Sequence, residues 1–143
     1  MKKIISLILL IGWMVLIFML SNQNSNVSLN ESGKVIEFIS STSNISNSNI
    51  DLWQIIIRKT AHILEYLVLC LLMYNYIRFY SKSASKWAIL FSLIYAIIDE
   101  THQLFVSGRT GQPLDILIDS IGIFFGYIIE VLYEKKFNNK ISN

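Results

Sequence analysis

Four long apolar stretches constrain the fold of this chain more than any other feature of its sequence. They lie at about residues 4–20, 55–77, 87–105 and 114–133, and each has the length of about 17–25 residues that an α-helix needs to cross a bilayer. The composition agrees, because 53% of the residues are hydrophobic and only 15% are charged. The sequence therefore predicts an all-α membrane protein, a four-helix transmembrane bundle that forms a single domain over residues 1–143.

The connection over residues 21–52 is polar and rich in serine and asparagine, so we expect an external loop without a core of its own. Within it, the amphipathic segment 34–39 predicts one short surface helix. The first apolar stretch has the basic start of a signal peptide, but no small-x-small cleavage site follows Leu20. We therefore interpret that stretch as a retained transmembrane helix.

The distribution of basic residues predicts the orientation of the four helices. Eight of the twelve lysine and arginine residues lie in the N-terminus, the 78–86 turn and the C-terminal tail: Lys2, Lys3, Arg78, Lys82, Lys86, Lys135, Lys136 and Lys140. Four spans place these three segments on one side of the membrane, and the positive-inside rule makes that side the cytoplasm. We therefore expect a multi-pass protein of the cytoplasmic membrane, with both termini in the cytoplasm and the 21–52 and 106–113 connections outside.

Ionisable residues interrupt three of the apolar stretches, where a charge is costly and marks a functional site by default. Arg58, His62 and Glu65 are spaced at i, i+4 and i+7, so they share one face of a helix. Lys59 points elsewhere around that helix, and we interpret it as an interfacial anchor. The second predicted helix thus presents one polar wall.

The other two polar groups fall at the end of the third stretch and at the start of the fourth. Asp99, Glu100 and Gln103 end the third stretch, where acids oppose the helix dipole unless a cation offsets them. Asp115 and Asp119 begin the fourth stretch. In the predicted topology all three groups lie at the outer end of the bundle, so we expect a polar pocket that opens to the outside.

Gly122 and Gly126 follow Asp119 on the same face of the fourth stretch. Their small-x-x-x-small spacing lets membrane helices approach closely. Elsewhere in the apolar stretches, we interpret Cys70 and Glu130 as structural residues. Cys70 is the single cysteine of the chain, so it forms no internal disulfide.

Three separated motifs, in this order, resemble the VanZ-like family of small bacterial membrane proteins. They are Arg58-Lys59…His62…Glu65-Tyr66, then Asp99-Glu100-x-x-Gln103, then Gly108-Arg109 and Asp115…Asp119. Ser21-Asn22-Gln23 also resembles the family's Ser-Ser-Gln element, with asparagine in place of one serine. The resemblance extends over about residues 10–133. It implies a protein of the bacterial cell envelope, and the family's founding member is associated with low-level resistance to the glycopeptide antibiotic teicoplanin. Relatives without a link to resistance are widespread, so the resemblance implies a family and not a reaction.

The candidate site residues are Arg58, His62, Glu65, Asp99, Glu100, Gln103, Arg109, Asp115 and Asp119. One interpretation is an enzyme that acts on lipid-linked envelope material, with Glu65 or His62 as the base and Arg58 and Arg109 as anion clamps. Oxygen ligands of this kind favour Mg²⁺, Mn²⁺ or Ca²⁺ over zinc. No phosphatase or acyltransferase motif is present, so the sequence leaves catalysis, metal and cofactor open.

Two further interpretations need no chemistry. The pocket of an accessory protein could bind a lipid or peptidoglycan-precursor head group, or a glycopeptide. Alternatively, the chain is a small transport module, although no broken-helix repeat of the kind found in secondary transporters is evident. In each case the charged cluster could instead be a structural network. The expected partners are the membrane bilayer and a lipid-linked cell-wall precursor or glycopeptide, with no nucleic acid.

Overall fold

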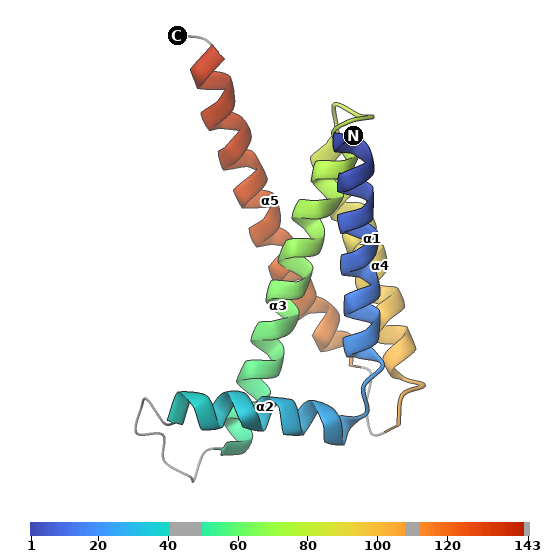
Figure 1. Ribbon diagram of the computed structural model, residues 1–143, viewed down its shortest axis with the longest axis vertical. Coiled ribbons are helices and arrows are strands. Elements are labelled where there is room, and N and C mark those ends of the chain that lie inside the picture. The colour runs from blue at the N-terminus through green and yellow to red at the C-terminus, as the bar shows by residue number, and fades with distance from the viewer. Residues whose placement is uncertain (41–49, 108–111, 142–143) are drawn as a thin grey trace.

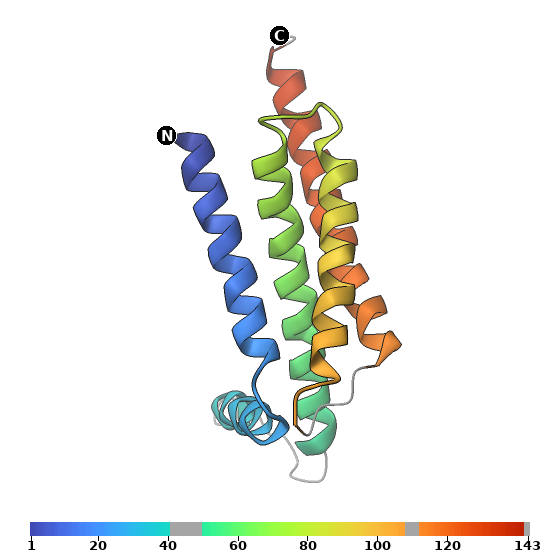
Figure 2. The same ribbon diagram turned by 90° about the vertical axis from the view of Figure 1, so that its right-hand side faces the viewer.

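A computed structural model describes residues 1–40, 50–107 and 112–141 of the chain. Every regular element in these residues is an α-helix. The helices are α1 (Lys2–Ser21), α2 (Ser25–Ser40), α3 (Ile50–Ile77), α4 (Ala84–Gln103) and α5 (Pro113–Ile141). Figures 1 and 2 show α1, α3, α4 and α5 as a bundle, with α2 lying across one end of it. The prediction of an all-α fold is confirmed.

The four predicted spans overlap α1, α3, α4 and α5, but two helices of the described chain have the length and composition of a membrane span. These are Lys2–Ser21 and Pro113–Lys136. By this measure two of the four predicted spans are supported, and the other two stay a prediction. A polar cluster occupies one end of α3 and of α4, around His62 and Asp99, whereas α1 carries no charge beyond its first two residues.

The connection predicted as a polar loop over residues 21–52 contains a helix of its own. The short helix expected at 34–39 extends over Ser25–Ser40. Ser32 and Ile36 are buried at 7% exposure each, and their i, i+4 spacing gives α2 one face that packs on the bundle.

The elements fall into two groups at the two ends of the bundle. α1 begins and α5 ends at the same end as the turn between α3 and α4, and α2 lies at the opposite end (Figures 1 and 2). This grouping matches the predicted topology, and the side of the membrane on which each group lies stays a prediction. α5 begins at Pro113, where the missing N–H costs nothing, and Asp115 in its first turn favours the helix dipole.

Glycines bring α5 close to α3. A Cβ atom added at Gly122 would lie 2.2 Å from the backbone oxygen of Ile63, and one added at Gly126 would lie 2.9 Å from the Cβ atom of Cys70. A larger residue at either position would push the two backbones apart. The predicted close approach through these glycines is confirmed, and it places the start of α5 against the polar face of α3.

Two hydrogen bonds from side chains to the backbone fix α1 in the bundle. Trp13 Nε1 donates to the backbone oxygen of Glu65 at 3.0 Å, and the Tyr95 hydroxyl donates to the backbone oxygen of Met14 at 2.7 Å. Both bonds involve the middle of α1, so they hold the C-terminal half of this helix beside the polar face of α3.

Candidate functional site

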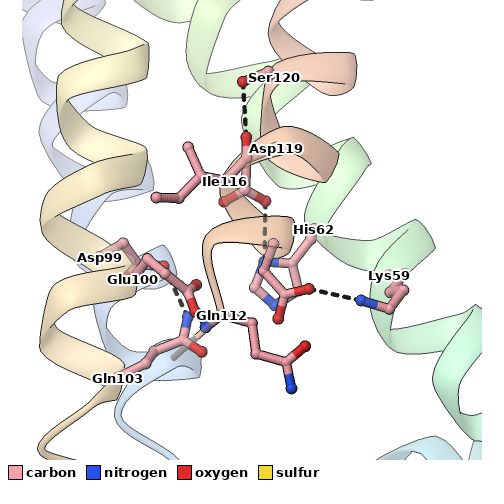
Figure 3. A network of polar contacts seen from close by, with 10 residues as sticks. Lys59, His62, Asp99, Glu100, Gln103, Gln112, Ile116, Asp119 and Ser120 are labelled. Carbon is pink, nitrogen blue, oxygen red and sulfur yellow. Dashed lines mark hydrogen bonds and ion pairs between the residues drawn. The ribbon is translucent and has the colours of Figure 1, made fainter. Parts of the chain in front are cut away.

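Two polar contacts join α3 to α5 at the end of the bundle where α2 lies (Figure 3). Lys59 Nζ lies 2.6 Å from Asp115 Oδ1, and His62 Nδ1 lies 3.2 Å from Asp119 Oδ1. Lys59 and His62 are three residues apart and the aspartates are four apart, so each pair occupies one face of its helix. The ammonium group of Lys59 is paired with α5, a contact that the interpretation of Lys59 as an interfacial anchor did not include.

Asp119 is the most deeply buried of the predicted site residues, at 1% exposure. Its Oδ1 atom contacts His62, and its Oδ2 atom is buried without a hydrogen-bond partner in the described residues. A buried carboxylate is stable only when it is paired or protonated. The contact also fixes the orientation of the His62 ring, because Nδ1 faces Asp119 and Nε2 lies on the opposite side.

The end of α4 contributes three buried residues, Asp99, Glu100 and Gln103, whose exposures are 4%, 5% and 4%. Gln103 Nε2 donates to Asp99 Oδ2 at 3.2 Å, one helical turn away. Glu100 Oε1 accepts a hydrogen bond from the backbone N–H of Gln112, immediately before α5. Glu100 therefore holds the connection from α4 to α5, while Asp99 faces the space beside α3 (Figure 3).

A pocket of about 220 Å³ opens between α3 and the polypeptide that leads from α1 into α2. Its polar wall consists of Arg58, His62 and Glu65 from α3 and Asp99 from α4. The rest of the lining is Leu20, Ser21, Gln23, Ser32, Val35, Ile57 and Ala61. The predicted face of α3 is therefore one wall of a pocket, as its spacing indicates, and apolar side chains line the same space.

A second hollow of about 290 Å³ continues from this pocket along α3. It is lined by Ser32, Asp51, Gln54, Ile55 and Arg58, so it shares Ser32 and Arg58 with the pocket. Arg58 thus stands between the two spaces. A guanidinium in this position can bind an anion on either side with its five N–H donors.

The side chains of the site can bind an anion at Arg58 and can move a proton at His62. A histidine whose Nδ1 is held by a buried carboxylate presents Nε2 for acid–base work, and His62 also lines the pocket. In the described residues, no group of three histidine, cysteine or acidic side chains has the geometry to hold a metal ion.

The structure brings together most of the predicted site residues, in two layers. Arg58, His62, Glu65 and Asp99 line the pocket. Behind them, Asp115 and Asp119 join α5 to α3, and Glu100 joins the end of α4 to the residue before α5. Gln103 contacts Asp99 within α4. Arg109 lies outside the described residues. Whether any of these residues performs chemistry stays a prediction.

Sequence reasoning missed the contribution of α2 and the contact of Lys59. Ser32 lines both hollows, but it lies in a serine- and asparagine-rich connection where no single residue stands out. The contact between Lys59 and Asp115 did have a signal. Lys59, His62 and Ile63 lie on neighbouring positions of one helical face, and Asp115 and Asp119 precede Gly122 on the facing helix.

These features define a class of protein: a small helical bundle with apolar outer helices, a polar cluster that joins three helix ends, and a pocket beneath a crossing helix. The family model described as VanZ/LLP1 matches residues 6–134. The chain belongs to this family, which confirms the resemblance of its three motifs. No curated protein and no solved structure matches the chain.

Proposed function

We propose that this protein is a multi-pass protein of the bacterial cytoplasmic membrane. Its helices α1, α3, α4 and α5 cross the bilayer. Exposed apolar side chains on the outer surface of the bundle support this reading. They include Ile4, Ile8, Val15, Met19, Phe91, Ile94, Ile98, Leu117, Phe124 and Leu132. A water-soluble monomer rarely exposes such a continuous apolar surface, whereas lipid tails cover it at no cost.

In this placement the pocket faces the outside, and it binds the anionic head group of a lipid-linked envelope precursor. The observation that carries this proposal is the pocket lining itself. Arg58 supplies a planar set of donors for phosphate or carboxylate, and Leu20, Val35 and Ile57 supply an apolar wall beside it. A ligand with a charged head and an apolar tail matches both surfaces. Glycopeptide tolerance would then follow from the binding of such a precursor or of the antibiotic itself.

The contact between His62 and Asp119 favours a second reading, in which the pocket also performs acid–base chemistry on the bound head group. Asp119 orients the imidazole, and Nε2 of His62 gains or loses the proton. The step needs a ligand atom within hydrogen-bond reach of Nε2. Binding alone requires Arg58, whereas chemistry requires His62 as well.

Ligand binding tests the first reading. The full chain in lipid nanodiscs is mixed with a polyprenyl phosphate, with the same polyprenyl alcohol, or with teicoplanin, and bound ligand is measured by native mass spectrometry. Wild-type protein should retain the phosphate and not the alcohol. Arg58→Gln should weaken binding by about 1.5–3 kcal/mol, which is the usual contribution of a hydrogen bond to a charged group.

Arg78→Gln is the matched control, because Arg78 follows the other end of α3 and is exposed. Equal binding by wild type and Arg58→Gln for all three ligands would refute the proposal and favour a structural network. If wild-type protein retains teicoplanin and not the polyprenyl phosphate, the ligand of the pocket is the antibiotic and not the precursor. Lipid mass spectrometry of cells carrying wild type or His62→Gln tests the chemistry, which requires a product that disappears in the variant.

A further inference from the structure

A second group of buried polar residues lies outside the candidate site, between α3, α4 and α5. This inner cluster consists of Cys70, Ser92 and Glu130, with exposures of 0%, 0% and 2%. Cys70 Sγ donates to Glu130 Oε1 at 3.4 Å. The other carboxyl oxygen, Glu130 Oε2, and Ser92 Oγ are both buried without a hydrogen-bond partner in the described residues.

Among the described residues, no cation pairs with the Glu130 carboxyl group. The ion pairs of the described residues join Lys59 to Asp115 and His62 to Asp119, and both belong to the candidate site. The groups that face Glu130 are Cys70 from α3, Ser85 from α4 and Glu134 on its own helix, and Ser92 of α4 lies on the other side of Cys70. A thiol is a weak donor, and an unpaired carboxylate in an apolar interior is very unfavourable. Glu130 is therefore a neutral, protonated acid in the folded bundle.

A polar route leads from Glu130 to one end of the bundle. Glu134 follows one helical turn later and is exposed. The hydroxyl of Tyr74 donates a hydrogen bond to Glu134 Oε1, and this contact lies one helical turn along both helices from the contact of Cys70 with Glu130. This is the end where α1 begins and α5 ends (Figure 1).

In the direction of the candidate site, the interface between α3 and α5 is tightly packed. The stretch of α5 between Asp119 and Glu130 contains Gly122 and Gly126, whose backbones lie directly on α3. Ile123, between them, is 2% exposed. This close contact leaves no room for water beside the glycines, so the inner cluster and the candidate site are separated from each other along the interface of α3 and α5.

We propose that Glu130 is a proton-binding site that exchanges with water through Tyr74 and Glu134 and is closed toward the pocket. A proton taken from water by the Glu134 carboxylate reaches Glu130, and the reverse transfer returns it to water. No other reactant is required. The proposal rests on contacts of α3, α4 and α5 and is independent of the ligand proposed for the pocket.

Infrared spectroscopy of the purified full chain tests this site. A protonated carboxyl group absorbs above the amide bands, and we expect such a band in wild type at neutral pH and its loss in Glu130→Gln. Glu134→Gln should keep the band, because Glu134 is exposed to water. If Glu130→Gln does not fold, Cys70→Ala replaces it. That variant removes the S–H donor and should shift the band to higher frequency. Superimposable wild-type and variant spectra would overturn the proposal.

The route is tested by transfer into D₂O, which lowers the frequency of the same band as the proton is exchanged for deuterium. Exchange in Tyr74→Phe and Glu134→Gln should be at least about tenfold slower than in wild type, since a positioned proton donor commonly contributes more than that. Arg58→Gln, at the pocket, should exchange at the wild-type rate. Slower exchange in Arg58→Gln, with wild-type rates in the other two variants, would show that the site opens to the pocket and would refute the route.

Discussion

Replacing Gly122 with alanine should destabilise the bundle more than the same replacement at any other glycine of the described residues. The new Cβ atom would lie 2.2 Å from the backbone oxygen of Ile63. Real contacts of this kind are not shorter than 3.0 Å, so the two helices must separate locally by at least 0.8 Å. Neither atom belongs to a flexible side-chain end, so the backbones themselves have to move.

The magnitude follows from two effects of that separation. Overpacking of a tight contact costs about 1–3 kcal/mol, and a clash with backbone falls at the upper end of this range. Asp119 lies one turn before Gly122, so a shift of 0.8 Å lengthens its 3.2 Å contact with His62 toward 4.0 Å. That length is beyond a hydrogen bond and leaves a buried carboxylate with a weaker partner. We therefore expect a loss of about 3–4 kcal/mol of unfolding free energy.

Thermal unfolding in a mild detergent measures this loss, with Gly12→Ala as the matched control. An added Cβ atom at Gly12 has nothing within 4 Å, and alanine has the better helix propensity, so this variant should be as stable as wild type or up to about 1 kcal/mol more stable. Gly126→Ala should lie between the two, because its Cβ atom would meet a side-chain atom at 2.9 Å. A Gly122→Ala protein that unfolds with wild-type stability would refute the close approach of α5 to α3.

Three other outcomes can be measured. A double-mutant cycle with Lys59→Gln and Asp115→Asn should give a coupling of about 0.2–1 kcal/mol, since Lys59 is 32% exposed, and a coupling of zero would mean that the contact is absent in solution. His62→Ala should cost about 3 kcal/mol or more in a denaturant titration, because it leaves a carboxylate buried without its donor, and a loss under 1 kcal/mol would contradict that burial. Asn30 and Ser83 are both exposed and lie at opposite ends of the bundle. A cysteine placed at Asn30 should react with an impermeant maleimide in intact cells, whereas one placed at Ser83 should react only after lysis. The reverse pattern would invert the proposed orientation.

The sequence predicted the helical bundle and much of the polar cluster because both depend on spacing within single helices. Arg58, His62 and Glu65 share a face at i, i+4 and i+7, and the structure has that face as a pocket wall. Gly122 and Gly126 carry their own signal for close packing, and the contact with α3 is present.

The sequence did not reveal which faces meet across the helices. The position of α2 over the pocket and the contact of Cys70 with Glu130 both depend on the relative rotation of helices that are distant in the chain. The periodicity of one helix contains no information about that rotation. Glu130 in particular has the spacing of an ordinary helix residue, and its burial becomes evident once α3 and α4 are placed around it.

The way in which α1 is attached has a consequence for its evolution. Two of the hydrogen bonds that anchor it reach backbone oxygens, one on Glu65 and one on Met14, and every residue type supplies such an oxygen. A third bond, from Asn75 Nδ2 to Ser6 Oγ, needs a side-chain acceptor. The axial register of α1 therefore depends on Trp13, Tyr95 and the Ser6 contact, and not on the side chains of Glu65 and Met14. Most other positions of α1 can exchange one apolar residue for another, so this helix is free to drift in sequence while the pocket that it borders keeps its shape.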